Sequence, residues 1–224
     1  MTLSIIIPVL NEAANIGAAL TALQPCRARG AEVIVADGGS GDGTPALAQP
    51  LCDRVVNAPR GRAVQMNAGA DAARGDVLLF LHADTQLPPD ADRLVLEGLA
   101  QSSRVWGRFD VQFGGDGLRL VACAMNARSR ATGIATGDQA MFVTRTAFEQ
   151  AGRFPPIALM EDIALSTSLR RIGRPLCLPA RVTTSDQRWR NNGALRTVLL
   201  MWSLRLRYFF GADPDKLARV YGYR

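Results

Sequence analysis

The sequence has 224 residues, of which 48% are hydrophobic, and a formal net charge of +6. This length and apolar content suit one α/β domain, and no apolar run reaches the roughly 20 residues that cross a bilayer. The N-terminal residues have no basic segment and no small-residue cleavage site, so we expect no signal peptide. The four cysteines are widely separated and form no C-x-x-C pair, which excludes an obvious zinc cluster or disulfide framework.

The positive charge is concentrated at the C-terminal end. Residues 188–224 contain eight basic and two acidic side chains, which gives +6, the whole net charge of the chain. Such an end suits phosphate groups or an anionic membrane surface. It lacks the basic face with interleaved aromatic residues that coats nucleic acid, so we expect no nucleic-acid partner. We expect a cytoplasmic protein, with a peripheral position at the inner face of the membrane as the alternative.

Predicted strands and helices alternate in the first half of the chain. We expect continuous buried strands at Leu3–Ile7 (stopping at Pro8), Val33–Ala36, Val55–Val56 and Asp76–Leu81. We expect helices at Asn11–Leu23 (with Asn11 as its cap), from Thr44–Pro45, and at Arg62–Ala73. Continuous apolar runs are typical of a parallel sheet covered on both faces. In such sheets the ligand lies at the carboxyl ends of the strands.

The second half of the chain is less regular. We expect strands at Trp106–Phe113 and Gln139–Val143, separated by a flexible segment, "NARSRATGIATGD". Two helices, Thr144–Ala151 and Glu161–Arg171, follow.

Polar clusters follow two of the predicted strands. "DGGSGDGT" begins with Asp37, and its glycines match neither a dinucleotide-binding fold nor a P-loop. "LLFLHADT" contains the only histidine, His82, two residues before Asp84. A carboxylate oxygen suits Mg²⁺ or Mn²⁺, and an imidazole suits Mn²⁺ better than Mg²⁺. A metal site and a purely structural strand end both fit these residues taken alone.

Four segments together resemble the family 2 glycosyltransferases. They are "SIIIPVLNEAANI", "VIVADGGSGDGT", "GRAVQMNAGADAARGDVLLFLHADT" and "MEDIALSTSLRRIG", and they extend over roughly Leu3–Gly173. The resemblance implies an α/β protein with the GT-A fold, a Rossmann-like and mostly parallel sheet flanked by helices. It implies a single domain over 1–224, with a nucleotide-sugar-binding half (1–98), an acceptor half (99–193) and a C-terminal amphipathic helical segment (194–224). Within the family the chain looks most like a small bacterial subgroup associated with radical-SAM proteins and arsenosugar biosynthesis.

The resemblance also implies a donor site. Asp37 would contact the nucleotide base or ribose, although Gly38 replaces the second aspartate of the usual pair. Asp84 would ligate a divalent cation, Mn²⁺ or Mg²⁺, while His82 replaces the first aspartate of the family's Asp-x-Asp and would bind the metal, a phosphate or the ribose. The residues that we expect to bind the nucleotide sugar are Pro8, Asn11, Glu12, Asp37, Gly39, Arg62, Asn67, His82, Ala83, Arg188 and Trp189.

The acid pair Glu161-Asp162 stands at a predicted helix start. Taken alone, the pair complements the helix dipole. The resemblance implies that Asp162 is the general base and Glu161 its support, with Asp138 as the other candidate for the base or for an acceptor contact. Arg188-Trp189 resembles part of the Q-x-x-R-W motif of processive relatives, with Ser185 in the place of the glutamine. Arg188 would clamp the diphosphate and Trp189 would stack on a sugar, or the pair packs the last loop onto the core.

The expected function is a metal-dependent, inverting transfer of a hexosyl group from a nucleotide-diphosphate sugar to an acceptor hydroxyl. One alternative is a nucleotidyltransferase, which would need a glycine-rich, arginine-containing loop where "PVLNEAAN" stands. A second alternative is a non-catalytic, membrane-associated binding module on the same fold. The acidic residues Asp37, Asp84 and Glu161-Asp162 argue against that module.

The stretch Leu195–Phe210 has apolar residues at helical spacing. Its expected apolar face consists of Leu195, Val198, Leu199, Trp202, Leu206 and Phe209. Apolar surface this wide must be covered. We favour packing on the protein or on a second copy as a homodimer, with a helix lying in the membrane interface near a lipid acceptor as the alternative.

Overall fold

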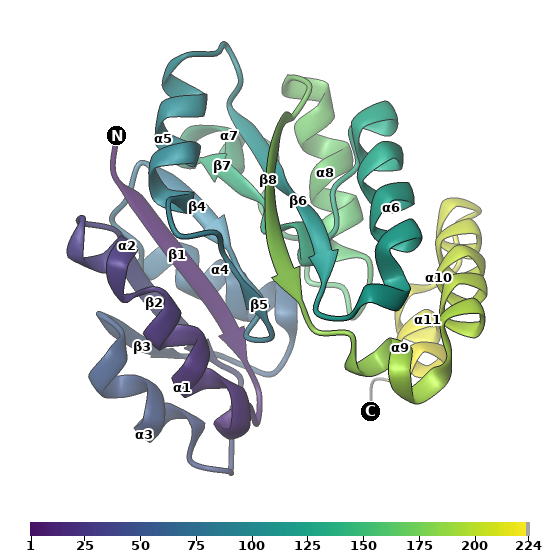
Figure 1. The fold of residues 1–224 in the computed structure, drawn as a ribbon, viewed down its shortest axis with the longest axis horizontal. Helices are drawn as coiled ribbons and strands as arrows, with labels where there is room; N and C mark the ends of the chain where they lie inside the picture. Colours follow the sequence, from purple (N-terminus) through teal and green to yellow (C-terminus); the bar gives the residue numbers. More distant parts are fainter. Residues whose placement is uncertain (223–224) are drawn as a thin grey trace.

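The computed structural model describes residues 1–222, without the side chains of Asp116, Arg188 and Asn192. Its centre is one eight-stranded sheet with the order β3-β2-β1-β4-β7-β6-β8-β5 (Figure 1). The strands are β1 (Leu3–Val9), β2 (Glu32–Asp37), β3 (Arg54–Asn57), β4 (Val77–Phe80), β5 (Thr85–Gln86), β6 (Trp106–Phe113), β7 (Phe142–Thr144) and β8 (Leu176–Thr184). The pairs β3-β2, β2-β1, β1-β4 and β6-β8 are parallel, whereas β4-β7, β7-β6 and β8-β5 are antiparallel.

Helices pack on both faces of the sheet because side chains along each strand alternate between two cores. In β1, Ile5 and Ile7 belong to one core and Ile6 to the other. The first core is covered by α1 (Ala13–Ala22), α2 (Gln24–Ala28), α3 (Thr44–Ala48) and α5 (Ala91–Ala100). The second core is covered by α4 (Arg62–Ala72), α7 (Arg145–Gln150) and α8 (Glu161–Ile172). In Figure 1 the two helix layers lie in front of and behind the sheet.

The predicted elements of the first half are confirmed, with shifts at their ends. β1 continues through Pro8 to Val9. A proline is tolerated there because β4 pairs with β1 only as far as Ile6, so Pro8 has a strand neighbour on one side alone. The prediction of Asn11 as a helix cap is wrong: Glu12 occupies the cap position of α1, and Asn11 has a left-handed backbone with φ 56°.

The second half contains elements that the sequence pattern does not reveal. The segment expected to be flexible belongs largely to α6 (Arg119–Thr132). This helix buries Ala122, Asn126 and Ser129, which are small or polar and give no hydrophobic periodicity. The predicted strand Trp106–Phe113 is confirmed at both ends as β6, whereas β5, β8 and α5 were not predicted.

The chain ends in three helices beside α6: α9 (Gln187–Asn192), α10 (Ala194–Phe209) and α11 (Pro214–Tyr221) (Figure 1). Leu204 of α10 and Leu217 of α11 pack with Leu159 and Met160, which precede α8. The expected apolar face of α10 is not the face that contacts the protein. Its exposed members are Leu195, Leu199, Trp202, Leu206 and Phe209. Over residues 1–222, none of the helices combines the length and apolarity that a bilayer crossing requires.

Candidate active site

Asp37 is the last residue of β2 and is buried at the carboxyl edge of the sheet. Its Oδ2 accepts hydrogen bonds from the backbone N–H groups of Gly39 (2.9 Å) and Ser40 (3.0 Å). Its Oδ1 is also buried but has no hydrogen-bond partner among the described residues. A buried acceptor is costly when it is unpaired, so Asp37 presents an oxygen that a donor group of a ligand would satisfy.

The loop after β1 is tied to this glycine-rich turn. The Asn11 N–H donates to Ser40 Oγ (2.8 Å), and the Gly41 N–H donates to Asn11 Oδ1 (2.9 Å). The next residue, Glu12, donates its N–H to Thr44 Oγ1 (2.9 Å). These bonds join the carboxyl ends of β1 and β2 into one polar edge, and Pro8 lies in β1 just before it.

Gln65 of α4 binds the same edge of the sheet. The sequence motifs do not identify this residue. Its Nε2 donates to the carbonyl oxygens of Val9 (2.6 Å) and Ala36 (2.9 Å), at the ends of β1 and β2. A Cβ on Gly38 would lie 2.9 Å from the Gln65 side chain. A side chain at position 38, where the resemblance expects a second aspartate, would therefore push the Gln65 amide away from these carbonyl oxygens.

Asp84 follows β4 and is exposed, with Ala83 buried beneath it. Within the described residues its carboxylate accepts a long hydrogen bond from Thr85 Oγ1 to Oδ1 (3.2 Å), so oxygen atoms remain available to a cation. Residues 1–222 contain no group of three or more His, Cys, Asp or Glu side chains that could hold a metal. A divalent cation bound through one or two side chains and completed by substrate phosphates fits this donor set.

His82 points across the site toward the 3-10 turn Gly137–Gln139. Its Nδ1 lies 3.6 Å from Asp138 Oδ1, and its side chain is 16% exposed. A Cβ on Gly137 would overlap the His82 ring, so the turn must have glycine there. Burial opposes the ionisation of Asp138, but His82, together with the charges of Arg62 and Arg205, holds the pKa of that carboxyl below its ordinary value.

Glu161 and Asp162 begin α8, directly after Met160, whose backbone is left-handed with φ 72°. Asp162 Oδ2 accepts from the Gly137 N–H (2.8 Å), and Oδ1 accepts from the Ile163 N–H (2.7 Å). Glu161 is buried, with Oε1 3.4 Å from Arg62 Nη1. Burial raises the pKa of Glu161, and the charge of Asp162 adds to this effect while Arg62 opposes it.

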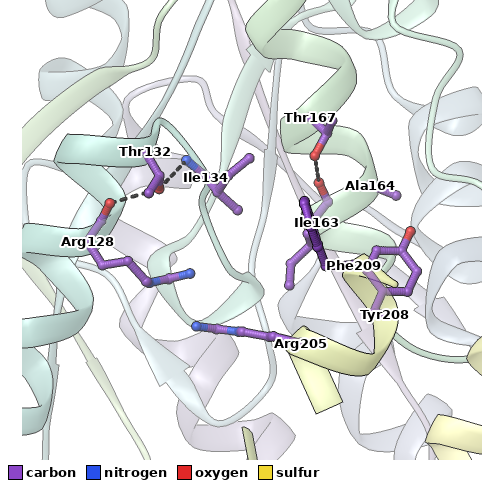
Figure 2. A pocket seen from close by; sticks show the side chains of 9 residues that line it. All are labelled: Arg128, Thr132, Ile134, Ile163, Ala164, Thr167, Arg205, Tyr208 and Phe209. Atoms are coloured by element: carbon purple, nitrogen blue, oxygen red, sulfur yellow. Dashed lines mark hydrogen bonds between the residues drawn. The ribbon is translucent and has the colours of Figure 1, made fainter. Parts of the chain in front are cut away.

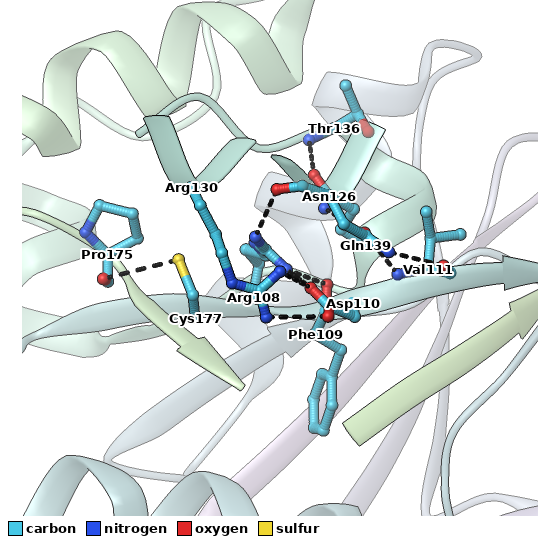
Figure 3. Close-up of polar contacts among 10 residues, drawn as sticks. All are labelled: Arg108, Phe109, Asp110, Val111, Asn126, Arg130, Thr136, Gln139, Pro175 and Cys177. Atoms are coloured by element: carbon cyan, nitrogen blue, oxygen red, sulfur yellow. Dashed lines mark hydrogen bonds and ion pairs between the residues drawn. The ribbon is translucent and has the colours of Figure 1, made fainter. Parts of the chain in front are cut away.

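A buried ion network lies behind the 3-10 turn (Figure 3). Arg108 of β6 is fully buried and forms an ion pair with Asp110. Arg130 of α6 donates to both oxygens of Asp110 (2.8 Å each). The Asn126 side chain pairs with both backbone groups of Val111 (2.9 Å each), so α6 is fixed against β6.

The same network extends to the turn that carries Asp138. Gln139 Nε2 donates to Asn126 Oδ1 (3.3 Å), and the Thr136 N–H donates to Gln139 Oε1 (3.3 Å). The turn is therefore held on one side by Asn126 and on the other by Asp162, through the Gly137 N–H.

Two expected donor-binding side chains are occupied by contacts within the protein. Both ends of the Asn67 amide bind the backbone of Phe154, at 2.8 and 3.2 Å. The Trp189 ring packs edge-on against Phe113, with 5.3 Å between centroids, and the Arg188 side chain lies outside the described part of the chain. Gly39 is exposed in the turn with φ 91°.

A sequence model of glycosyl transferase family 2 matches residues 4–147. The chain belongs to glycosyl transferase family 2. It is 32% identical over 151 residues to the undecaprenyl-phosphate 4-deoxy-4-formamido-L-arabinose transferase of Pseudomonas paraeruginosa, a match over 60% of this chain and 44% of that protein. The Aeromonas hydrophila enzyme of the same name is 30% identical over 148 residues, 60% of this chain and 45% of that protein. The chain thus matches less than half the length of these relatives.

Solved structures share the fold at low sequence identity. Staphylococcus aureus TarS in complex with UDP gives a TM-score of 0.68 at 17% identity, over 83% of this chain and 60% of that one. Glucosyl-3-phosphoglycerate synthase from Mycobacterium tuberculosis, in complex with Mn²⁺, UDP and glucosyl-3-phosphoglycerate, gives 0.62 at 19% identity, over 82% of this chain and 70% of that one. The expected GT-A class is confirmed, and membership of family 2 makes the chain a glycosyltransferase rather than a nucleotidyltransferase.

Proposed function

We propose that this family 2 glycosyltransferase is metal-dependent and inverting, and that it moves a hexosyl group from a nucleotide-diphosphate sugar to an acceptor hydroxyl. One observation carries the proposal: the turn Gly137–Gln139 contacts both His82, at the end of β4, and Asp162, at the start of α8. The candidate metal-binding segment and the candidate base therefore lie on two sides of one turn. This is the arrangement that a displacement between a bound diphosphate and an incoming hydroxyl requires.

The donor would lie along the carboxyl edge of the sheet. Asp37 Oδ1, which lacks a partner among the described residues, would accept from the base or ribose. Asp84 would hold Mn²⁺ or Mg²⁺ together with the diphosphate, with His82 as a second ligand or a phosphate contact. The cation would supply positive charge to the leaving diphosphate. Arg62, beside Glu161, supplies further positive charge near the same place.

Asp162 would act as the base. The Gly137 and Ile163 N–H groups orient its carboxylate and leave lone pairs free on both oxygens. The acceptor oxygen attacks the anomeric carbon while the bond from that carbon to the diphosphate breaks on the opposite side, and the hydroxyl proton passes to Asp162. Attack from the opposite side inverts the anomeric centre. Glu161 positions Arg62, and Asp138 is the second candidate for the base.

The acceptor is proposed to be used close to a membrane. The names of the curated relatives specify undecaprenyl phosphate, a lipid. In this chain the exposed apolar side chains of α10 include Trp202 and Phe209, and the same helix contains Arg196 and Arg207. An amphipathic helix with such residues binds an anionic membrane surface. The placement in the subgroup associated with radical-SAM proteins and arsenosugar biosynthesis is part of the proposal and rests on "GRAVQMNAGA" and "FLHADT".

A thermal-shift panel tests the proposed donor class. Unfolding is followed with UDP, GDP, CDP and dTDP sugars, each with Mn²⁺, with Mg²⁺ and with chelator. We expect at least one nucleotide sugar to stabilise the protein only when a cation is present, by about 2.7 kcal/mol at one hundred times its dissociation constant. Stabilisation that is equal in chelator would contradict metal dependence, and no stabilisation by any sugar nucleotide would contradict the function.

A further inference from the structure

A cavity of about 550 Å³ lies between α6, α8 and α10. Ile163, the residue that follows Asp162, lines its wall. Arg128 of α6 and Arg205 of α10 enter it from opposite sides, and their guanidinium groups point toward each other (Figure 2). None of the motifs in the sequence includes these two arginines. The cavity therefore brings together two positive charges from helices far apart in the chain.

The Arg128 guanidinium lacks hydrogen-bond partners for some of its N–H groups. Its Nε and Nη2 atoms are buried and have no hydrogen-bond partner among the described residues. Burial lowers the pKa of Arg128 to about 10, and the charge of Arg205 adds to this effect while Asp162 opposes it. The group stays charged at neutral pH, so its unpaired N–H donors are costly.

Arg205 increases that cost because its charge has the same sign as that of Arg128. An anion between the two guanidinium groups would turn the repulsion into two charge-assisted contacts. A phosphate group fits this role best, since its several oxygens accept from two guanidinium groups at once. A carboxylate offers fewer oxygens and a smaller charge.

We propose that the cavity between Arg128 and Arg205 binds a phosphate group of the acceptor and thereby places the acceptor beside Asp162. That the bound molecule is the acceptor rests on the proposed function, whereas the presence of a phosphate site does not. The donor edge is a different place, formed by Asp37 and Asp84 at the ends of β2 and β4. The rest of the ligand is apolar or uncharged, because Ile134 and Phe209 also line the cavity.

Inorganic phosphate is the probe for the test. It is titrated calorimetrically into protein already saturated with Mn²⁺ and the nucleoside diphosphate that binds best, so that the donor site is filled. The variants are Arg128→Gln and Arg205→Gln. The controls are Arg119→Gln on α6 and Arg171→Gln on α8, which remove an exposed arginine from two of the helices that form the cavity. We expect about a tenfold or larger loss of phosphate affinity in the two cavity variants, wild-type affinity in the controls, and recovery of most of the affinity in Arg128→Lys.

The same titration with glycerol 3-phosphate, and co-sedimentation with phosphatidylglycerol vesicles against phosphatidylcholine vesicles, distinguishes a soluble phosphate ester from a lipid headgroup. Arginine-dependent binding of either form supports the proposal. Phosphate affinity that is unchanged in both cavity variants, or wild-type protein that binds none of the probes, overturns it. The two proposals can be contradicted independently. Normal nucleotide binding without phosphate binding would contradict only the phosphate site. Arginine-dependent phosphate binding without nucleotide binding removes only the donor function.

Discussion

At the scale of single residues, the acidic groups of the site are held mainly by backbone groups. Asp162 is oriented by the N–H groups of Gly137 and Ile163, and Asp37 by those of Gly39 and Ser40. Their positions therefore follow from the path of the chain. Asp84 differs, since its carboxylate is exposed and, among the described residues, accepts only a long contact from the neighbouring Thr85. This suits a group whose partner arrives with the substrate.

Backbone strain gathers at the same places. Three of the four non-glycine residues with positive φ in the described chain, Asn11, Ala140 and Met160, adjoin the glycine-rich turn, the turn of Asp138 and the start of α8. The fourth, Arg153, follows α7. Each such residue costs on the order of 1–3 kcal/mol and persists where the surrounding structure fixes it. The first three strained residues therefore lie in the segments that position the acidic side chains of the candidate site.

Asp162→Asn tests the assignment of the base. Asparagine keeps the shape of the side chain but cannot take up the proton, so we expect nucleotide-sugar binding to stay at the wild-type level while kcat falls about 10²-fold or more. Release of the nucleoside diphosphate from the donor is the readout. Asp138→Asn is the comparison, and full activity in Asp162→Asn with a loss in Asp138→Asn would transfer the role to Asp138.

At the scale of elements, β6 and α6 are joined by buried charged and polar groups. The pairing of β6 with β8 shifts register between Phe109 and Asp110, and such an irregularity redirects side chains. Asp110 there meets both Arg108 and Arg130. Because Asn126 and Gln139 connect this network to the turn of Asp138, the network supports the site as well as the fold.

Asp110→Asn is expected to destabilise the protein by about 3 kcal/mol, because it leaves the buried Arg108 guanidinium without its counter-charge. The free energy of unfolding from chemical denaturation is the measurement. Asp71→Asn removes a carboxylate whose side chain is 64% exposed and paired with Arg153, so it should cost less than about 1 kcal/mol. Equal losses in the two variants would show that burial of the Asp110 network contributes nothing particular.

The exposed face of α10 is expected to bind anionic membranes. Trp202→Ser and Leu199→Ser remove side chains that are 70% and 61% exposed, so co-sedimentation with phosphatidylglycerol vesicles should fall without a loss of stability. Leu120→Ser, at an exposed leucine on α6, is the control and should bind as the wild type does. A wild-type protein that binds no vesicle and forms a dimer that Trp202→Ser dissociates would instead assign the face to a second copy.

At the scale of the whole molecule, the sequence predicts the elements whose buried residues form continuous apolar runs. β1, β2 and β4 are of this kind, and Trp106–Phe113 is predicted at both ends although Arg108 and Asp110 interrupt its apolar residues. α6 is not predicted because its buried face contains the polar residues Asn126 and Ser129, and Asn126 binds β6 through hydrogen bonds. β8 is not predicted because it is interrupted by Pro179 and buried at few positions. Polar packing leaves no periodic signal.

The candidate site divides in the same way. Motifs at strand ends and at a helix start identify Asp37, Asp84 and Asp162, since short local patterns carry them. Gln65, Arg128 and Arg205 acquire their roles only when separate elements meet, so no local pattern predicts them. Local sequence patterns thus point to the acidic groups of the candidate site, and the remaining residues come together only in the folded chain.

Titration calorimetry of the nucleoside diphosphate with Mn²⁺ tests the proposal that Asp84 makes donor binding depend on the metal. Asp84→Asn removes a charged oxygen ligand at constant volume, so we expect the Mn²⁺-dependent binding to be lost while the melting temperature of the free protein is unchanged. Asp90→Asn, at an exposed aspartate in the following loop, should bind as the wild type does, and His82→Ala should lose less than Asp84→Asn. Wild-type affinity in Asp84→Asn, with the same dependence on Mn²⁺, would contradict the account.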